Sequence, residues 1–132
     1  MEKQPKWGPG YQPVNAVLYR IEYAILFLAV VAYLGLRGTQ LVGSDATAYW
    51  IAFVFWIIFP DLAAFIPIGL ASRNRQWPSW GSRLYNTVHT VVVWALVFGM
   101  TWLLFQSPNW PMMAWLGHIW ADRAVGYYLR AR

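Results

Sequence analysis

The chain of 132 residues contains no cysteine, which excludes disulfide bonds and thiolate metal ligands. Charged residues are scarce as well: they make up 11% of the chain, against about 25% in a typical soluble domain. The sequence also lacks a His-Glu-x-x-His zinc motif, a glycine-rich phosphate loop and a serine next to a histidine in a nucleophile motif. These absences exclude a separate soluble domain and the common motif-based enzyme classes.

Hydrophobic residues, by contrast, make up 59% of the chain and gather in four long runs. The runs cover approximately residues 16–36, 47–66, 85–105 and 110–129. A helix of about 20 residues is about 30 Å long, which matches the hydrocarbon core of a bilayer. We therefore expect an all-α polytopic membrane bundle of four transmembrane helices over residues 16–132, preceded by an N-terminal extension over residues 1–15.

The basic residues predict how this bundle is oriented. Nine of the ten lie in the N-terminal region, in the connector after the second run or near the C-terminus, and the two opposite loops contain only Arg37. The positive-inside rule then places both termini in the cytoplasm. Pro67 and Gly69 predict that the second helix ends after Ile66.

Several polar or charged residues interrupt the apolar runs, and the predicted helices bring them to similar depths. They are Glu22, Asp61, Asn86, His89, His118, Asp122 and Arg123. Each ionisable group costs about 2.5 to 3.5 kcal/mol to place in a membrane helix, so such groups usually face one another, water or a ligand. His118 and Asp122 are four residues apart and share a helix face. We expect these seven residues to form a buried polar network, in which both histidines, Asp61 and Asp122 come together.

Three interpretations of this network are open from the sequence. It is a structural hydrogen-bonded network that fixes helix register, or a metal or acid–base site built from two histidines and two aspartates. In the third, His118 or His89 ligates a pigment metal, with Ala114 and Gly117 leaving room for the ring beside His118.

Ten tryptophans and eight tyrosines lie mostly at the ends of the predicted helices. Such aromatic belts sit at the headgroup level of a bilayer, because the rings are apolar and their N–H or O–H groups are polar. Four of these aromatic residues lie on the predicted cytoplasmic side and form a predicted docking surface for a partner: Trp7, Tyr11, Trp77 and Trp80.

Three separated blocks of sequence carry a family resemblance. They are Phe59-Pro60-Asp61-Leu62, Tyr85-Asn86-Thr87-Val88-His89-Thr90, and Trp115-Leu116-Gly117-His118-Ile119-Trp120-Ala121-Asp122-Arg123-Ala124-Val125-Gly126-Tyr127. These blocks, with Arg20-Ile21-Glu22 before them, resemble a small bacterial membrane family catalogued as domain of unknown function 4260. The resemblance implies four spans and no established activity, and with it we expect the bacterial inner membrane. The chain departs from that pattern by its N-terminal extension, its longer basic connector at 68–84 and its many tryptophans.

These departures are expected of a family member that docks onto something else. The sequence thus predicts a non-catalytic accessory subunit of a larger membrane complex, with a phototrophic reaction-centre and light-harvesting assembly as one concrete example. Its expected contacts are lipids, partner helices and, at its surface, (bacterio)chlorophyll or carotenoid, and not nucleic acid. The alternative is a small intramembrane enzyme, dependent on a metal or on acid–base chemistry, that uses the aspartates and histidines.

Overall fold

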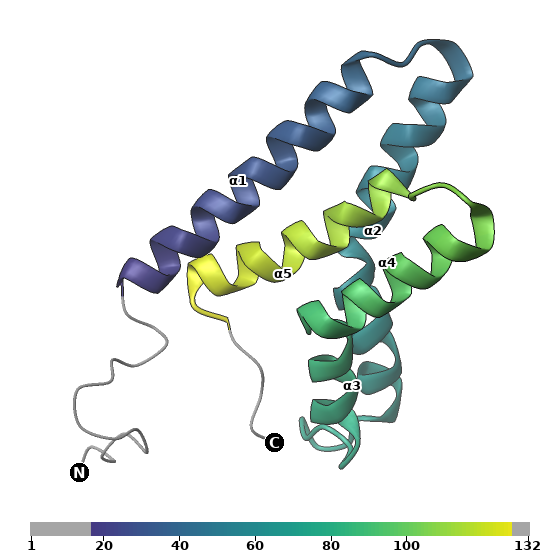
Figure 1. Cartoon of the computed structure of the whole chain (residues 1–132). Helices are drawn as coiled ribbons and strands as arrows, with labels where there is room; N and C mark the ends of the chain where they lie inside the picture. Colours follow the sequence, from purple (N-terminus) through teal and green to yellow (C-terminus); the bar gives the residue numbers. More distant parts are fainter. Residues whose placement is uncertain (1–16, 128–132) are drawn as a thin grey trace.

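The computed structural model describes residues 17–127, which form five α-helices and one 3-10 helix (Figure 1). The helices are α1 (Val17–Thr39), α2 (Gly43–Ala71), α3 (Gly81–Val88), α4 (Val91–Phe105), the 3-10 helix η1 (Trp110–Met112) and α5 (Met113–Val125). Residues 17–127 contain no β-strand, and their extended pairing is limited to an isolated bridge between Arg73 and Gln76. The predicted all-α fold is confirmed.

Two of these helices, α1 and α2, are long and apolar enough to cross a membrane. Their 23 and 29 residues correspond to lengths of about 35 Å and 43 Å, against about 30 Å of hydrocarbon. A third span is present if α3 and α4, which meet at an angle of 58°, count as one bent helix. By contrast, α5 as described has 13 residues and is about 20 Å long, which is shorter than the hydrocarbon core.

The prediction that the second helix ends at Pro67 is wrong. Helix α2 contains both Pro60 and Pro67 and continues to Ala71. A proline inside a helix removes one backbone hydrogen bond, but the last turns of α2 gain packing in return. Ala64 and Ile68 are buried there against Tyr85 and Val88 of α3.

The predicted third segment is continuous in the sequence but broken in the structure. Helix α3 ends at Val88, and the backbone of His89 and Thr90 leaves the helical conformation before α4 begins at Val91. The indole N–H of Trp115 on α5 donates a 2.7 Å hydrogen bond to the Val88 carbonyl at this point. The break therefore lies against α5, whose Trp115 side chain satisfies one carbonyl at the break, that of Val88.

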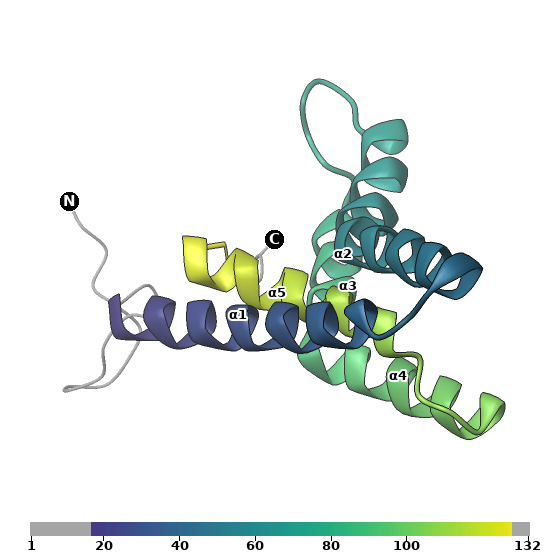
Figure 2. The ribbon, with the colours of Figure 1, turned by 90° about the horizontal axis from the view of Figure 1, so that it is seen from above.

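Helices α1 and α5 lie side by side and antiparallel along most of their lengths (Figures 1 and 2). At one end, Arg20 donates a 2.9 Å hydrogen bond to the Ala124 carbonyl, and at the other the Arg37 guanidinium lies 4.6 Å from the Trp110 ring centroid. Between them, Gly117 faces Val30, with room for little more than a methyl group. This pairing fixes how α5 is rotated, and hence where His118 and Asp122 point.

The outer surface of the described chain carries many large apolar side chains. Within helix α4 as described, no residue is fully buried, and Leu103, Leu104 and Phe105 at its end are each about three-quarters exposed. Soluble monomers rarely expose apolar surface on this scale. The surface is consistent with a protein that lies in a membrane, as the lengths of α1 and α2 also indicate.

Candidate metal centre

Four side chains from three parts of the chain converge at one point in the structure. They are Asp61 from α2, His89 from the break after α3, and His118 and Asp122 from α5. One nitrogen or oxygen atom from each lies within 4.8 Å of the other three. We call these four side chains the His–Asp ring. The structure thus brings together the four residues for which one network was predicted.

Histidine and aspartate atoms alternate around the ring. His89 Nε2 lies 3.2 Å from Asp61 Oδ1 and 3.5 Å from Asp122 Oδ2. His118 Nε2 lies 3.3 Å from each of the same two oxygens. The four atoms lie up to 4.8 Å apart, so the centre of the ring is about 2.4 Å, half of that separation, from the most separated atoms. This is slightly longer than the distances of about 2.0 to 2.2 Å at which histidine and carboxylate ligands bind zinc.

The break between α3 and α4 determines how His89 enters the ring. Its Nδ1–H donates a 2.8 Å hydrogen bond to the Tyr85 carbonyl, which accepts only, so the neutral ring must carry its proton on Nδ1. The imidazole also stacks on the Tyr85 ring with centroids 3.9 Å apart. Nε2 is left facing the two carboxylates and lies within hydrogen-bonding distance, 3.2 Å, of Asp61 Oδ1. It donates to that oxygen when both ring nitrogens are protonated and holds a lone pair when the ring is neutral.

His118 reaches the ring from α5 and has a backbone hydrogen-bond partner in the Ile57 carbonyl of α2. Its Nε2 is buried and, among residues 17–127, has no hydrogen-bond partner. The two carboxylate oxygens lie 3.3 Å away, within ion-pair distance of this nitrogen. A buried polar atom without a partner costs about 1 to 3 kcal/mol, so this nitrogen needs a proton acceptor or a cation.

Both histidines thus use a backbone carbonyl to orient one nitrogen and present the other to the carboxylates. This is the arrangement found at protein metal sites, where the second ring nitrogen of a ligand usually donates to a carbonyl or carboxylate. Two carboxylates and two nitrogen lone pairs repel one another at these distances unless a positive charge lies among them. A divalent cation at the centre, or protonation of one imidazole, removes that repulsion.

The ring is closed on its histidine side and open on its aspartate side. The side chains of His89 and His118 are 3% and 13% exposed, whereas those of Asp122 and Asp61 are 24% and 47% exposed. Two firmly held nitrogens and one accessible carboxylate are consistent with a centre in which a water molecule or substrate reaches the metal past Asp61.

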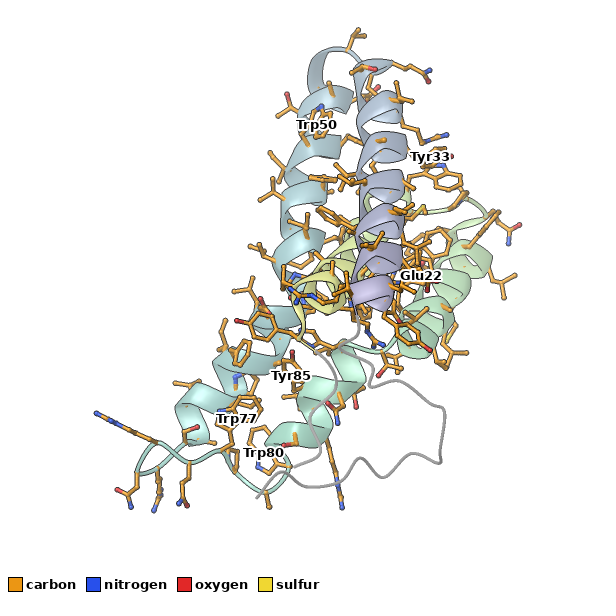
Figure 3. The ribbon with its side chains drawn as sticks, turned by 90° about the vertical axis from the view of Figure 1, so that its left-hand side faces the viewer. Glu22, Tyr33, Trp50, Trp77, Trp80 and Tyr85 are labelled. Atoms are coloured by element: carbon orange, nitrogen blue, oxygen red, sulfur yellow. The ribbon has the colours of Figure 1, made fainter. Side chains whose placement is uncertain are left out.

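The remaining predicted polar residues lie outside the ring. Glu22 is exposed on α1 and forms no ion pair with residues 17–127 (Figure 3). Asn86 lies on α3, where its carbonyl accepts hydrogen bonds from the Thr90 hydroxyl and the His89 amide. Arg123 donates a 3.1 Å hydrogen bond to the His89 carbonyl and lies over the Tyr23 ring. Arg123 therefore supports His89 without joining the ring.

Tyr85 and His89, four residues apart, were expected from the sequence to share a helix face, but Trp115 and Ile57 were not identified as supports of the site. Trp115 resembles a membrane-interface tryptophan in the sequence, yet its side chain is buried. No sequence signal marks Ile57, because its contribution is a backbone carbonyl.

The small residues near His118 do not leave space for a pigment within the described helices. Ala114 is buried against Val30 and Leu34 of α1, and Gly117 faces Val30 and Phe27. Helix α1 thus occupies the side on which room for a macrocycle was expected. His118 Nε2 is directed at carboxylates instead, which fits a bare metal ion.

Of the predicted docking residues, Trp77 and Trp80 lie in the described part of the chain (Figure 3). Trp77 is half-buried and packs against the rings of Phe65 and Tyr85, whereas Trp80 is exposed. Trp7 and Tyr11 lie outside the described residues.

No protein-family model, curated protein sequence or solved structure matches the chain. The resemblance to domain of unknown function 4260 therefore stays a prediction, and the functional argument depends on the geometry of the His–Asp ring.

Proposed function

We propose that the chain is a small membrane enzyme that depends on one divalent transition-metal ion held by the His–Asp ring. One observation carries this proposal: the buried Nε2 of His118 lies 3.3 Å from two carboxylate oxygens and has no hydrogen-bond partner in residues 17–127. A metal ion at the centre of the ring would bind the lone pair of that nitrogen, and it would balance the negative charges of the two carboxylates.

The donor set narrows the choice of metal. Two imidazole nitrogens favour zinc, iron, cobalt, nickel or copper over magnesium and calcium, which prefer oxygen ligands alone. Two carboxylates make the site harder than a purely histidine site and favour zinc, iron(II) or manganese(II) over copper(I). We infer zinc or iron(II) as the resident ion.

The proposed reaction class follows from the open side of the ring. A metal with three firm protein ligands and one replaceable position acts as a Lewis acid and activates water for hydrolysis. Asp61, the most exposed member, is the ligand that would give way, and its carboxylate would then be placed to accept a proton.

The membrane arrangement is part of the same proposal. We propose four spans in a bacterial inner membrane with both termini in the cytoplasm, the third being the bent α3–α4 pair and the fourth starting at η1. The distribution of basic residues supports this topology. It would place the His–Asp ring in the cytoplasmic half of the bilayer.

Metal analysis of the full chain purified in detergent tests the proposal. After removal of metal with a chelator, the protein is incubated with zinc, iron(II), manganese(II) or cobalt(II) separately and desalted. We expect one ion per chain for zinc or iron(II), and cobalt absorption bands typical of mixed nitrogen and oxygen ligation. His118→Ala should abolish this binding, and Glu22→Gln, which alters an exposed acid outside the ring, should not. Stoichiometric binding that survives His118→Ala would contradict the proposal.

The second candidate is the accessory subunit of a larger membrane complex. It is favoured by helix α4, in whose described residues no side chain is fully buried, so that lipids or partner helices have a long apolar surface to cover. A phototrophic assembly and surface pigments remain predictions from the sequence. A metal in the His–Asp ring would then have a structural role, and isolation of the native complex in mild detergent distinguishes the two.

A further inference from the structure

A second polar site lies at the end of the α1–α5 pair where Arg37 meets Trp110, opposite the end where Arg20 meets Ala124. A pocket of about 250 Å³ opens there between the end of α1, the start of α2 and the turn before η1. Its lining includes Arg37, Gln40, Tyr49, Asn109 and Trp110. The turn beside the pocket joins α1 and α2, the two helices that are long and apolar enough to cross a membrane, so the pocket lies at one end of both helices.

Arg37 is held in place in this pocket by aromatic rings. Its guanidinium lies 4.6 Å from the Trp110 ring centroid and 5.8 Å from that of Tyr33. It also donates a long hydrogen bond of 3.4 Å to the Tyr33 hydroxyl. Stacking of this kind fixes the plane of a guanidinium and leaves donors at its edge for an anionic oxygen.

No carboxylate balances this charge in the described chain. Every ion pair found within residues 17–127 is between a histidine and an aspartate of the His–Asp ring. The pocket lining contains no Asp or Glu among the described residues, and its other polar side chains are the Gln40 and Asn109 amides and the Tyr49 hydroxyl. The Tyr49 hydroxyl already donates to the Leu34 carbonyl at 2.6 Å.

We infer that this pocket binds the headgroup of an anionic phospholipid. The Arg37 guanidinium pairs with the phosphodiester oxygens, for which its fork of donors is suited, and the two amides bind hydroxyl groups beyond the phosphate. A lining without a carboxylate has no partner for the ammonium group of a choline or ethanolamine headgroup. The pocket therefore selects phosphatidylglycerol over phosphatidylcholine.

Lipid retention by the full chain tests this inference. The protein is reconstituted in nanodiscs that contain equal amounts of phosphatidylglycerol and phosphatidylcholine, extracted in mild detergent and analysed by native mass spectrometry. Wild-type protein should retain phosphatidylglycerol at a ratio of about tenfold over phosphatidylcholine, because the Arg37 charge, unbalanced by any carboxylate in the lining, disfavours the choline ammonium but not a glycerol headgroup. Arg37→Gln should lose that preference. Arg73→Gln, which removes the same charge from an exposed connector residue, should keep it.

Two further arms separate the remaining outcomes. If millimolar inorganic phosphate displaces the lipid, the site binds free phosphate and the lipid inference is overturned, as it is by equal retention of both lipids. If Arg37→Gln does not fold, Gln40→Leu with Asn109→Leu leaves the Arg37–Trp110 stacking in place and should still weaken the preference severalfold. An unchanged preference in that folded double variant also overturns the inference. None of these results depends on a metal in the His–Asp ring.

Discussion

Nε2 of His118 lies 3.3 Å from Oδ1 of Asp61, although the two residues belong to different helices, α5 and α2. The same nitrogen is equally close to Asp122, one turn further along its own helix. Asp61 thus links α2 to α5, and its second contact, with His89, links α2 to the break between α3 and α4. The site and the packing of three helices therefore depend on the same contacts.

Removal of the metal should lower the thermal stability of the protein. A ligand that binds only the folded state stabilises it by about 2.7 kcal/mol at a concentration one hundred times its dissociation constant. We expect the melting temperature in detergent to rise with added zinc or iron(II) and to fall after chelation. The melting temperature of His118→Ala should be the same with and without metal. A wild-type melting temperature that does not respond to any of the tested ions would contradict the metal centre.

Loss of one ring member should destabilise the protein more than loss of a large apolar surface group. Asp122→Leu leaves two buried histidine nitrogens with one carboxylate fewer, and an unsatisfied buried polar group costs about 1 to 3 kcal/mol. Leu103→Ala is the control, because Leu103 is 74% exposed and faces away from the core. In thermal melts in detergent, Asp122→Leu should have a clearly lower melting temperature than Leu103→Ala. Equal melting temperatures would show that the ring does not stabilise the fold.

Much of the ring could be predicted because depth in a membrane helix can be counted along the sequence. His118 and Asp122 share a face by their spacing, and Asp61 and His89 lie at a similar depth. Depth does not determine rotation about the helix axis, however. Glu22 is exposed on α1 and does not join the ring, whereas α1 packs Val30 and Leu34 against Ala114 of α5.

The break at His89 was not predictable from the apolar pattern. The run from 85 to 105 is strongly apolar only from Val91 onward and contains Asn86, Thr87, His89 and Thr90 before that, but no proline or glycine marks the break. The interruption depends on tertiary contacts, namely the Trp115 hydrogen bond to the Val88 carbonyl and the Arg123 hydrogen bond to the His89 carbonyl. Likewise, Pro67 does not end α2, because packing against α3 outweighs the lost backbone hydrogen bond.

Arg123 should influence metal affinity although it is not a ligand. Its hydrogen bond to the His89 carbonyl holds the α3–α4 break in the conformation that directs Nε2 into the ring. Changes to such supporting contacts typically cost 10-fold to 100-fold in metal affinity. We expect Arg123→Gln to weaken zinc binding by about that factor in a competition assay with a chelating dye, while stoichiometry at saturation stays at one. Arg83→Gln, in α3 but outside these contacts, serves as the charge-matched control, and equal affinities in both variants would remove Arg123 from the site.

The close contact of α1 with α2 should make one glycine of α1 far more sensitive than another. A methyl group at Gly38 would lie 2.8 Å from Tyr49 Cε1 and would also clash with the Trp50 ring, whereas one at Gly35 meets no atom within 4 Å. Overpacking of this kind costs about 1 to 3 kcal/mol, and alanine is otherwise a better helix former than glycine. Gly38→Ala should therefore lower the melting temperature, and Gly35→Ala should leave it unchanged or raise it. The opposite order would show that α1 and α2 pack differently.

The proposed topology can be tested directly because the chain has no cysteine, so that single cysteines report individual positions. Ser44 lies at the start of α2, Ser107 between α4 and η1, and Ser79 in the connector before α3. With both termini in the cytoplasm, the first two positions face the periplasm and the third faces the cytoplasm. Cysteine at Ser44 or Ser107 should react with a membrane-impermeant maleimide added to intact cells, and cysteine at Ser79 should react only after the membrane is opened. Labelling of Ser79→Cys in intact cells, with protection of the other two, would reverse the orientation and place the His–Asp ring in the periplasmic half. Protection of Ser107→Cys alone would mean that α4 does not complete a crossing, and the count would fall to the two spans formed by α1 and α2.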